Sequence, residues 1–191
     1  MNAAELLRPG LLQGASLLLA GPPTLLGAAV EEAFSELGAH VSTCLPDGQD
    51  EGAIDAAVAR VLAEAGSIDV LVVEGAGLFV EGASGALRAC LDSAWNVTRA
   101  VVNAAFIGRG GRIVFLAPAA EAGEHAMATR AGLENLARTL SVEWARHDVN
   151  TIAIAPGSST SAQEIAALAA YLASPAGTYF SGCLLDLGGG G

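Results

Sequence analysis

The chain has 191 residues and a formal net charge of −11, with only 15% charged residues against 52% hydrophobic ones. Its 20 acidic residues outnumber 9 basic ones and no basic run occurs, which argues against nucleic-acid binding. The three cysteines, Cys44, Cys90 and Cys183, are far apart, which favours reduced cytoplasmic thiols over a disulfide framework or a metal site.

The length predicts one domain over residues 1–191. We interpret the excess of apolar residues as a buried subunit interface. The alternative is that it reflects only the abundance of Ala and Gly. An uncharged segment at residues 11–30 is long enough for a membrane span, but glycines and prolines interrupt it, so we expect no membrane insertion.

Short apolar runs alternate with segments of helical periodicity along the chain. The first run, residues 15–20, is continuously apolar, which is typical of a central parallel strand buried on both faces. Strands are predicted at residues 15–20, 39–44, 68–73, 112–116, 150–155 and 183–187. Helices are predicted at residues 25–37, 54–65, 87–107, 129–146 and 163–173. This alternation predicts a three-layer α/β fold with a doubly wound parallel sheet.

The segment at residues 111–157 reads as strand, loop, long helix and strand, and it ends in a Pro-Gly turn. Together with Asp69-Val70-Leu71-Val72 and Leu172-Ala173-Ser174, this segment resembles the short-chain dehydrogenase/reductase family, and the resemblance covers nearly the whole chain. It implies a truncated form of that family's Rossmann-like fold. Two stretches are short: the strand that borders the adenine in the family is missing, and only residues 158–162 stand where the family has a long substrate-covering segment.

The family's glycine turn, TGxxxGxG, corresponds to residues 20–27. Gly21 and Gly27 are kept, but Leu25 replaces the middle glycine. In the family, that glycine lets the backbone approach a pyrophosphate at a helix N-terminus. We expect the leucine to fill the space that the phosphates need. Pro22 and Pro23 remove two backbone donors from the same turn.

Two further positions argue against a dinucleotide. Cys44-Leu45-Pro46 follows the second strand, where a charged residue would bind the adenosine ribose. Glu74 begins the segment that corresponds to the family's Asn-Asn-Ala-Gly, and it would bring negative charge toward an anionic cofactor. We therefore predict that this chain binds no cofactor.

The resemblance also assigns the catalytic Asn, Ser, Tyr and Lys to positions that hold Cys90, Pro118, Ala126 and Arg130. The family's reaction needs a phenol to pass a proton, a cation to lower the pKa of that phenol, and a hydroxyl to position the substrate. Only the charge of Arg130 remains, so we predict no catalysis. The alternative is a divergent lyase or dehalogenase that uses Arg130 and His125 without a dinucleotide, although His125 is more simply read as an exposed loop residue.

The two long helices keep apolar faces at helical spacing. Part of each face must cover the sheet. In the family these helices also pair with their copies in a neighbouring subunit as a four-helix interface, and the last helix and strand form a second interface. The predicted interface residues are Leu91, Thr98, Val101, Ala105, Leu133, Leu136, Leu140 and Trp144.

These observations predict a non-catalytic pseudoenzyme subunit. It would join a catalytically complete paralogue in a hetero-oligomer, with a tetramer expected, and NAD would bind in the partner subunit. The plan of truncation resembles an inactive subunit of an NAD-dependent hydroxyacyl-CoA dehydrogenase. A homo-oligomeric binding or regulatory protein is the remaining alternative.

Overall fold

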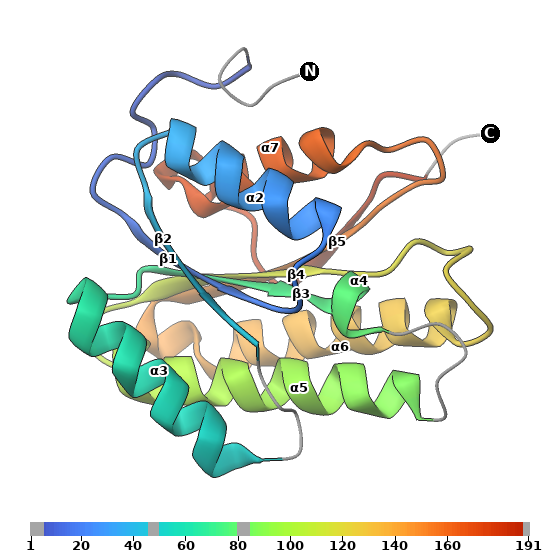
Figure 1. The fold of residues 1–191 in the computed structure, drawn as a ribbon, viewed down its shortest axis with the longest axis horizontal. Coiled ribbons are helices and arrows are strands. Elements are labelled where there is room, and N and C mark those ends of the chain that lie inside the picture. The colour runs from blue at the N-terminus through green and yellow to red at the C-terminus, as the bar shows by residue number, and fades with distance from the viewer. Residues whose placement is uncertain (1–5, 46–49, 80–84, 189–191) are drawn as a thin grey trace.

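The computed structural model describes residues 6–45, 50–79 and 85–188. Six parallel strands form one sheet in the order β2-β1-β3-β4-β5-β6 (Figure 1). They are β1 (Ser16–Ala20), β2 (His40–Cys44), β3 (Val70–Glu74), β4 (Gly111–Leu116), β5 (Val149–Ala155) and β6 (Cys183–Asp186). The predicted fold class is confirmed. In the described part of the chain β2 is the edge strand beyond β1.

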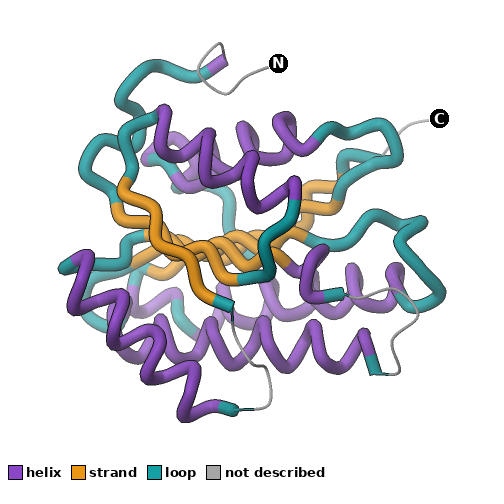
Figure 2. Tube along the Cα trace, viewed as in Figure 1, coloured by secondary structure: helices purple, strands orange, loops and turns teal. Residues whose placement is uncertain are grey.

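Helices cover both faces of the sheet, as Figure 2 shows. One face carries α2 (Leu25–Glu36) and α7 (Ala162–Ala173), and the other carries α3 (Glu51–Ala65), α5 (Ala86–Val101) and α6 (Ala126–Glu143). A single turn, α4 (Gly75–Leu78), follows β3. A π-helical segment, Val102–Phe106, continues α5, and short 3-10 helices lie at Ala145–His147 and Pro175–Gly177. No helix among the described residues is both long and apolar enough to span a membrane.

Local sequence sets the helix boundaries. Asp50 caps α3 by accepting a hydrogen bond from the Ala53 N–H, so the helix begins three residues before the predicted start. Ser161 and Glu164 form a reciprocal capping box at α7. The connection from β5 to α7 is therefore short, spanning residues 156–161.

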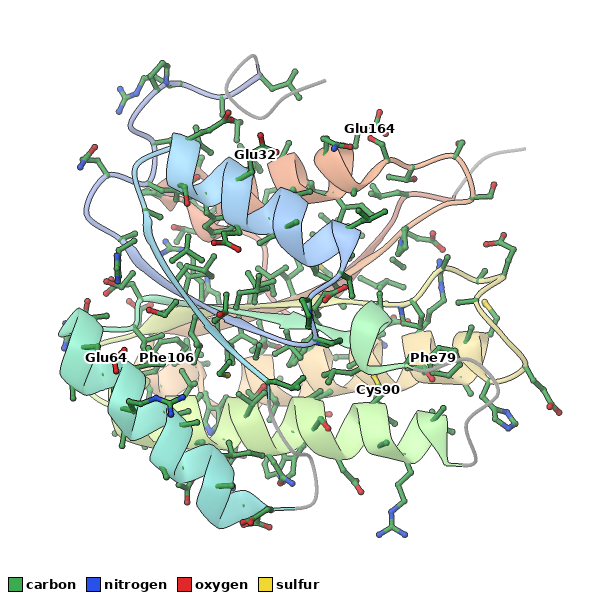
Figure 3. All side chains as sticks on the ribbon, viewed as in Figure 1. Glu32, Glu64, Phe79, Cys90, Phe106 and Glu164 are labelled. Carbon is green, nitrogen blue, oxygen red and sulfur yellow. The ribbon has the colours of Figure 1, made fainter. Side chains whose placement is uncertain are left out.

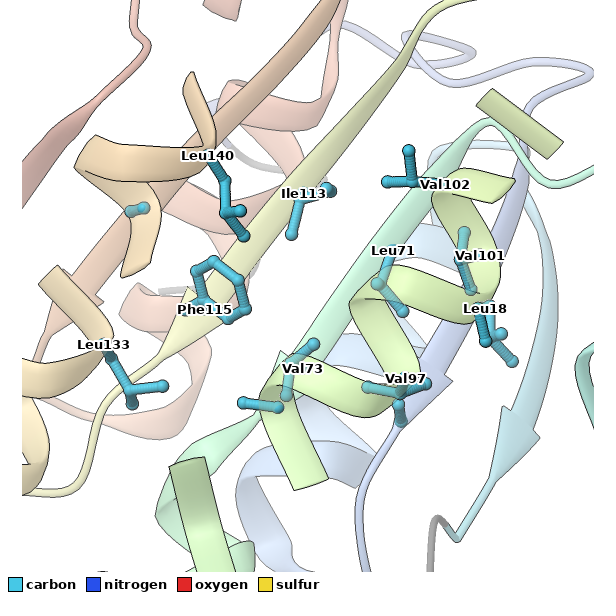
Figure 4. Packing of buried hydrophobic residues seen from close by; sticks show 14 of the residues in the cluster. Leu18, Leu71, Val73, Val97, Val101, Val102, Ile113, Phe115, Leu133 and Leu140 are labelled. Atoms are coloured by element: carbon cyan, nitrogen blue, oxygen red, sulfur yellow. The ribbon is translucent and has the colours of Figure 1, made fainter. Parts of the chain in front are cut away.

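The core consists of two layers, one on each face of the sheet. Successive strand side chains point to opposite faces, so Leu18 of β1 packs against α5 whereas Leu17 packs under α2. Figure 4 shows the layer beneath the sheet, where Phe115 of β4 lies near Leu133 and Leu140 of α6. Because β1, β3 and the inner part of β4 are buried on both faces, their residues are apolar except for Ser16 of β1 and Glu74 of β3.

The interface prediction needs correction. Five of the eight residues are buried in the layer beneath the sheet, so their side chains are not available to another subunit; they are Thr98, Val101, Ala105, Leu133 and Leu140. The helical periodicity marked the face that covers the sheet. The remaining three, Leu91, Leu136 and Trp144, are partly exposed.

A residue outside the predicted set is more exposed than these. The side chain of Trp95 on α5 is 41% exposed, and its ring stacks on that of Trp144 with centroids 6.3 Å apart and planes 9° from parallel. This pair joins the outer surfaces of α5 and α6. Gly132 allows the close approach of the two helices, because a Cβ there would lie 2.7 Å from Leu91 Cδ1.

Candidate functional site

The carboxyl ends of all the strands meet at one edge of the sheet. The chain passes from β1 outward to β2 and returns on the other side of β1 as β3, so the strand order reverses between β1 and β3. In doubly wound sheets, ligands bind outside the carboxyl ends of the strands at such a switch point. Two clusters occupy this edge, one around Glu74 at the end of β3 and one around Arg130 between the ends of β4, β5 and β6.

The glycine turn after β1 has few free donors. The Gly21 N–H donates to the Cys44 carbonyl at 2.9 Å, and the Gly27 N–H donates to Thr24 Oγ at 3.0 Å. Pro22 and Pro23 have no N–H. Four positions of the turn are therefore unavailable to a phosphate, whereas dinucleotide sites depend on such donors.

Leu25 also belongs to this turn, and its side chain is 88% exposed. It projects into solvent at the first residue of α2. We expected the Leu25 side chain to fill the space that the phosphates need. The structure instead fills the inner side of the turn with Pro22, Thr24 and Glu74.

Glu74 is the buried charged residue of the switch point. The side chains of Val70 and Val72 face α2, and the alternation of the strand places Glu74 on the same face. It is 1% exposed; Oε1 accepts a hydrogen bond of 2.6 Å from the Thr24 hydroxyl, and the buried Oε2 has no hydrogen-bond partner among the described residues. Burial raises the pKa of the Glu74 carboxyl above its ordinary value, and the bond from Thr24 opposes part of that rise.

The residues do not fit the pyrophosphate of a dinucleotide. A Cβ on Gly21 would lie 2.8 Å from Glu74 Cβ. A Cβ on Gly77 would lie 2.8 Å from both Glu74 Oε2 and Pro22 Cγ. The turn after β1 and the segment after β3 are thus packed against each other, and the carboxyl group lies between them.

A hollow of about 410 Å³ lies between the ends of β1 and β2, and residues 21–24 and Gly27 of the turn form one of its walls. Thr43, Cys44 and the exposed Glu31 and Arg60 also line it. Burial raises the pKa of the Cys44 thiol to about 11, so the thiol is neutral at physiological pH. Because no acidic residue of β2 lines it, this hollow lacks the usual ligand of an adenosine ribose.

Arg130 holds the second cluster together. Its guanidinium donates to the Pro118 carbonyl at 3.2 Å, to the Pro156 carbonyl at 2.9 Å and to Asp186 Oδ1 at 3.1 Å. The side chain is buried whereas Asp186 is half-exposed. A single residue of α6 therefore ties the ends of β4, β5 and β6, and its charge is engaged by protein oxygens.

Two other positions that the resemblance assigns to catalytic residues, Cys90 and Ala126, are also buried. Cys90 lies on the side of α5 that faces the sheet (Figure 3), donates to the Gly75 carbonyl at 3.4 Å, and has its pKa raised to about 12 by burial. Ala126 is fully buried at the start of α6. His125, immediately before it, is exposed. The structure brings Pro118 and Arg130 into contact, because the guanidinium donates to the Pro118 carbonyl.

Sequence reasoning missed two members of these clusters. Asp186 lies 56 residues from Arg130, and no local pattern links the two. Thr24 could have been found, because a threonine directly before an apolar helix is a typical N-cap.

The fold and the strand order define a Rossmann-like, doubly wound α/β protein. The sequence model of the short chain dehydrogenase family matches residues 11–172, and the chain belongs to that family.

Relatives agree with this assignment. The peroxisomal 2,4-dienoyl-CoA reductase of Rattus norvegicus is 27% identical over 95% of this chain and 85% of its own length. Oxidoreductase UcpA of Salmonella typhimurium is 30% identical over 75% of this chain, and the match spans 60% of UcpA. The structure of the citronellol catabolism dehydrogenase AtuB of Pseudomonas aeruginosa aligns with a TM-score of 0.78 and 26% identity, covering 95% of this chain and 97% of that one.

Proposed function

We propose that this chain is a non-catalytic subunit of a hetero-oligomeric, NAD-dependent short-chain dehydrogenase. The cofactor and the reacting groups belong to a catalytically complete paralogue, and this chain supports that partner. The observation that carries the proposal is the closed second cluster: Arg130 is bound to three protein oxygens, and Pro118 and Ala126 provide no group that could move a proton.

The substrate that we propose for the assembly is a hydroxyacyl-CoA, such as 2-(hydroxybenzyl)succinyl-CoA in anaerobic toluene degradation. The plan of truncation supports it, and the name of the rat relative gives a CoA thioester as that protein's substrate. The free thiols of Cys44, Cys90 and Cys183 support a cytoplasmic location.

The enzyme alternative has no specific observation in its favour. It needs the guanidinium of Arg130 to meet a substrate, but that group is buried and bonded to the ends of three strands. His125 is exposed outside that cluster. We therefore do not propose lyase or dehalogenase chemistry.

Titration of the isolated chain with NADH tests the cofactor part of the proposal. We expect no heat of binding in calorimetry up to about 1 mM NADH, the range of a very weak complex. Micromolar affinity would contradict the proposal.

Purification of the tagged chain from its source cell tests the partner. We expect a second polypeptide that is a full-length short-chain dehydrogenase, in an assembly of fixed stoichiometry. A single polypeptide in a defined oligomer would favour the homo-oligomeric alternative instead.

The partner surface that we propose is the outer face of α5 and α6 around the Trp95–Trp144 pair. Tryptophans are frequent anchors of interfaces. Replacing Trp95 with alanine is expected to weaken the hetero-oligomer about tenfold or more, as measured by sedimentation of the reconstituted complex. Leu25→Ala removes an exposed apolar side chain from the opposite face and is the matched control; equal weakening by both variants would exclude this surface.

A further inference from the structure

Glu74 lies where a doubly wound sheet normally receives its ligand. It is the last residue of β3, next to the end of β1, at the point where the strand order reverses. An ionisable side chain is seldom buried here without a partner charge, and no ion pair to Glu74 occurs among the described residues. The placement therefore needs a reason other than core packing.

We propose that the Glu74 carboxyl is a built-in substitute for an anionic ligand, and that it keeps diphosphate-bearing molecules out of the glycine turn, in addition to the two prolines that remove backbone donors from that turn. This inference rests on the proposed function only in that the wild-type chain holds no dinucleotide. It adds that Glu74 is a cause of this exclusion, and it names diphosphates as the class of ligand that the opened site would bind.

The first support is the contact with the N-terminus of α2. Thr24 is the N-cap of this helix: its hydroxyl oxygen accepts from the Gly27 N–H, and the hydroxyl hydrogen is donated to Glu74 Oε1. The positive end of the helix dipole favours an anion at this place. Glu74 is thus connected through one hydroxyl group to a backbone donor that a bound phosphate would otherwise use.

The second support is the unpartnered oxygen. Within the part of the chain that the structure describes, the buried Oε2 has no hydrogen bond, and it lies 3.4 Å from the position of a Cβ on Gly27 and 2.8 Å from that of a Cβ on Gly77. The oxygen therefore fills the narrow space between two glycines. A buried polar atom without a partner is unfavourable for folding, so this arrangement is not explained as a stabilising contact.

The third support is what removal of the side chain would leave. Gly21, Gly27 and Gly77 surround the carboxyl group, and none of them has a side chain that could collapse into its place. A shorter residue at position 74 would open a space that is bordered by the Thr24 hydroxyl and the first turn of α2. Opening this space would release the Thr24 hydroxyl from its bond to Glu74 and expose the N-terminal end of α2, whose dipole favours an anion such as a diphosphate.

Binding of inorganic pyrophosphate and of ADP to the full chain tests the proposal, by calorimetry and by thermal shift. We expect Glu74→Ala to bind pyrophosphate at least about tenfold more tightly than the wild-type chain, which is within the effect of a helix N-terminus on an anion. Glu74→Gln removes the charge but not the volume, so we expect it to gain little.

Glu32→Ala is the matched control, because it removes an exposed carboxylate of α2 that does not line the hollow beside the glycine turn. An equal gain in pyrophosphate affinity in this variant would mean that the loss of any negative charge near α2 is sufficient, and it would overturn the proposal. If Glu74→Ala does not fold, Glu74→Asn, one methylene shorter than glutamate, takes its place in the same assay. A folded shorter variant with wild-type affinity would also overturn the proposal, whereas NADH binding by the wild-type chain would contradict the proposed function itself.

Discussion

Replacing Arg130 with alanine is expected to lower the free energy of unfolding by about 3 kcal/mol, as measured by urea denaturation. The variant loses three hydrogen bonds, to the Pro118 and Pro156 carbonyls and to Asp186. The two carbonyls follow β4 and β5 and belong to buried residues, and each unsatisfied buried group costs about 1–3 kcal/mol. A group kept only for charge at a vestigial active site would show a far smaller effect.

Two further variants make this experiment specific. Arg130→Lys keeps the charge but lacks the planar fork that reaches several acceptors, so it should recover only part of the loss. Arg138→Ala, on the same helix, removes an exposed arginine whose ion pair with Glu134 spans one turn, and we expect a change of about 0.5 kcal/mol or less. If Arg130→Ala were as mild as Arg138→Ala, Arg130 would not tie the strand ends together.

Arg130 stands at a position that the family resemblance assigns to a catalytic residue, and its guanidinium links α6 to the ends of β4, β5 and β6. The connection from β5 to α7 ends in the Ser161–Glu164 capping box. Internal hydrogen bonds of the chain therefore hold this cluster of strand ends together.

Most of the fold could be predicted because its signals are local. Continuous apolar runs marked the central strands, and Asp50, Gly66 and Ser161 sit at helix ends where capping residues are expected. An error of one residue at a strand boundary concealed a residue of the candidate site. The third strand was predicted to end at residue 73, but β3 includes Glu74, and this additional residue carries the buried carboxyl.

The surface was harder to predict than the core. Apolar residues such as Val101 of α5 and Leu133 of α6 belong to stripes at helical spacing. Such a stripe occurs whether the helix covers its own sheet or contacts a neighbouring subunit, so periodicity could not distinguish a core face from an interface. Trp95 lies beside the predicted stripe, and its stacking on Trp144 appears only once α5 and α6 are placed side by side. The pairing of Arg130 with Asp186 depends in the same way on tertiary structure.

Replacing Glu74 with glutamine is expected to stabilise the chain at pH 8 by about 2 kcal/mol relative to the wild type, the scale of an uncompensated buried polar group. Burial raises the pKa of Glu74 in the folded state above its ordinary 4.5, despite the opposing bond from Thr24. The folded chain therefore binds the proton more tightly than the unfolded chain. The stabilisation that the protonated Glu74 carboxyl gives to the folded chain is fully present below pH 4.5 and is lost as the pH rises through the folded-state pKa.

Glutamine matches the shape of the protonated carboxyl group and does not titrate. The stability difference between Glu74→Gln and the wild type should therefore be small at acidic pH and grow toward pH 8, as measured by urea denaturation at a series of pH values. Glu31→Gln removes an exposed carboxylate from α2 and should stay within about 0.5 kcal/mol of the wild type throughout. Parallel pH profiles for Glu74→Gln and the wild type would mean that the Glu74 carboxyl is solvated in the folded chain, and the closure of the glycine turn by a buried carboxyl group would then be wrong.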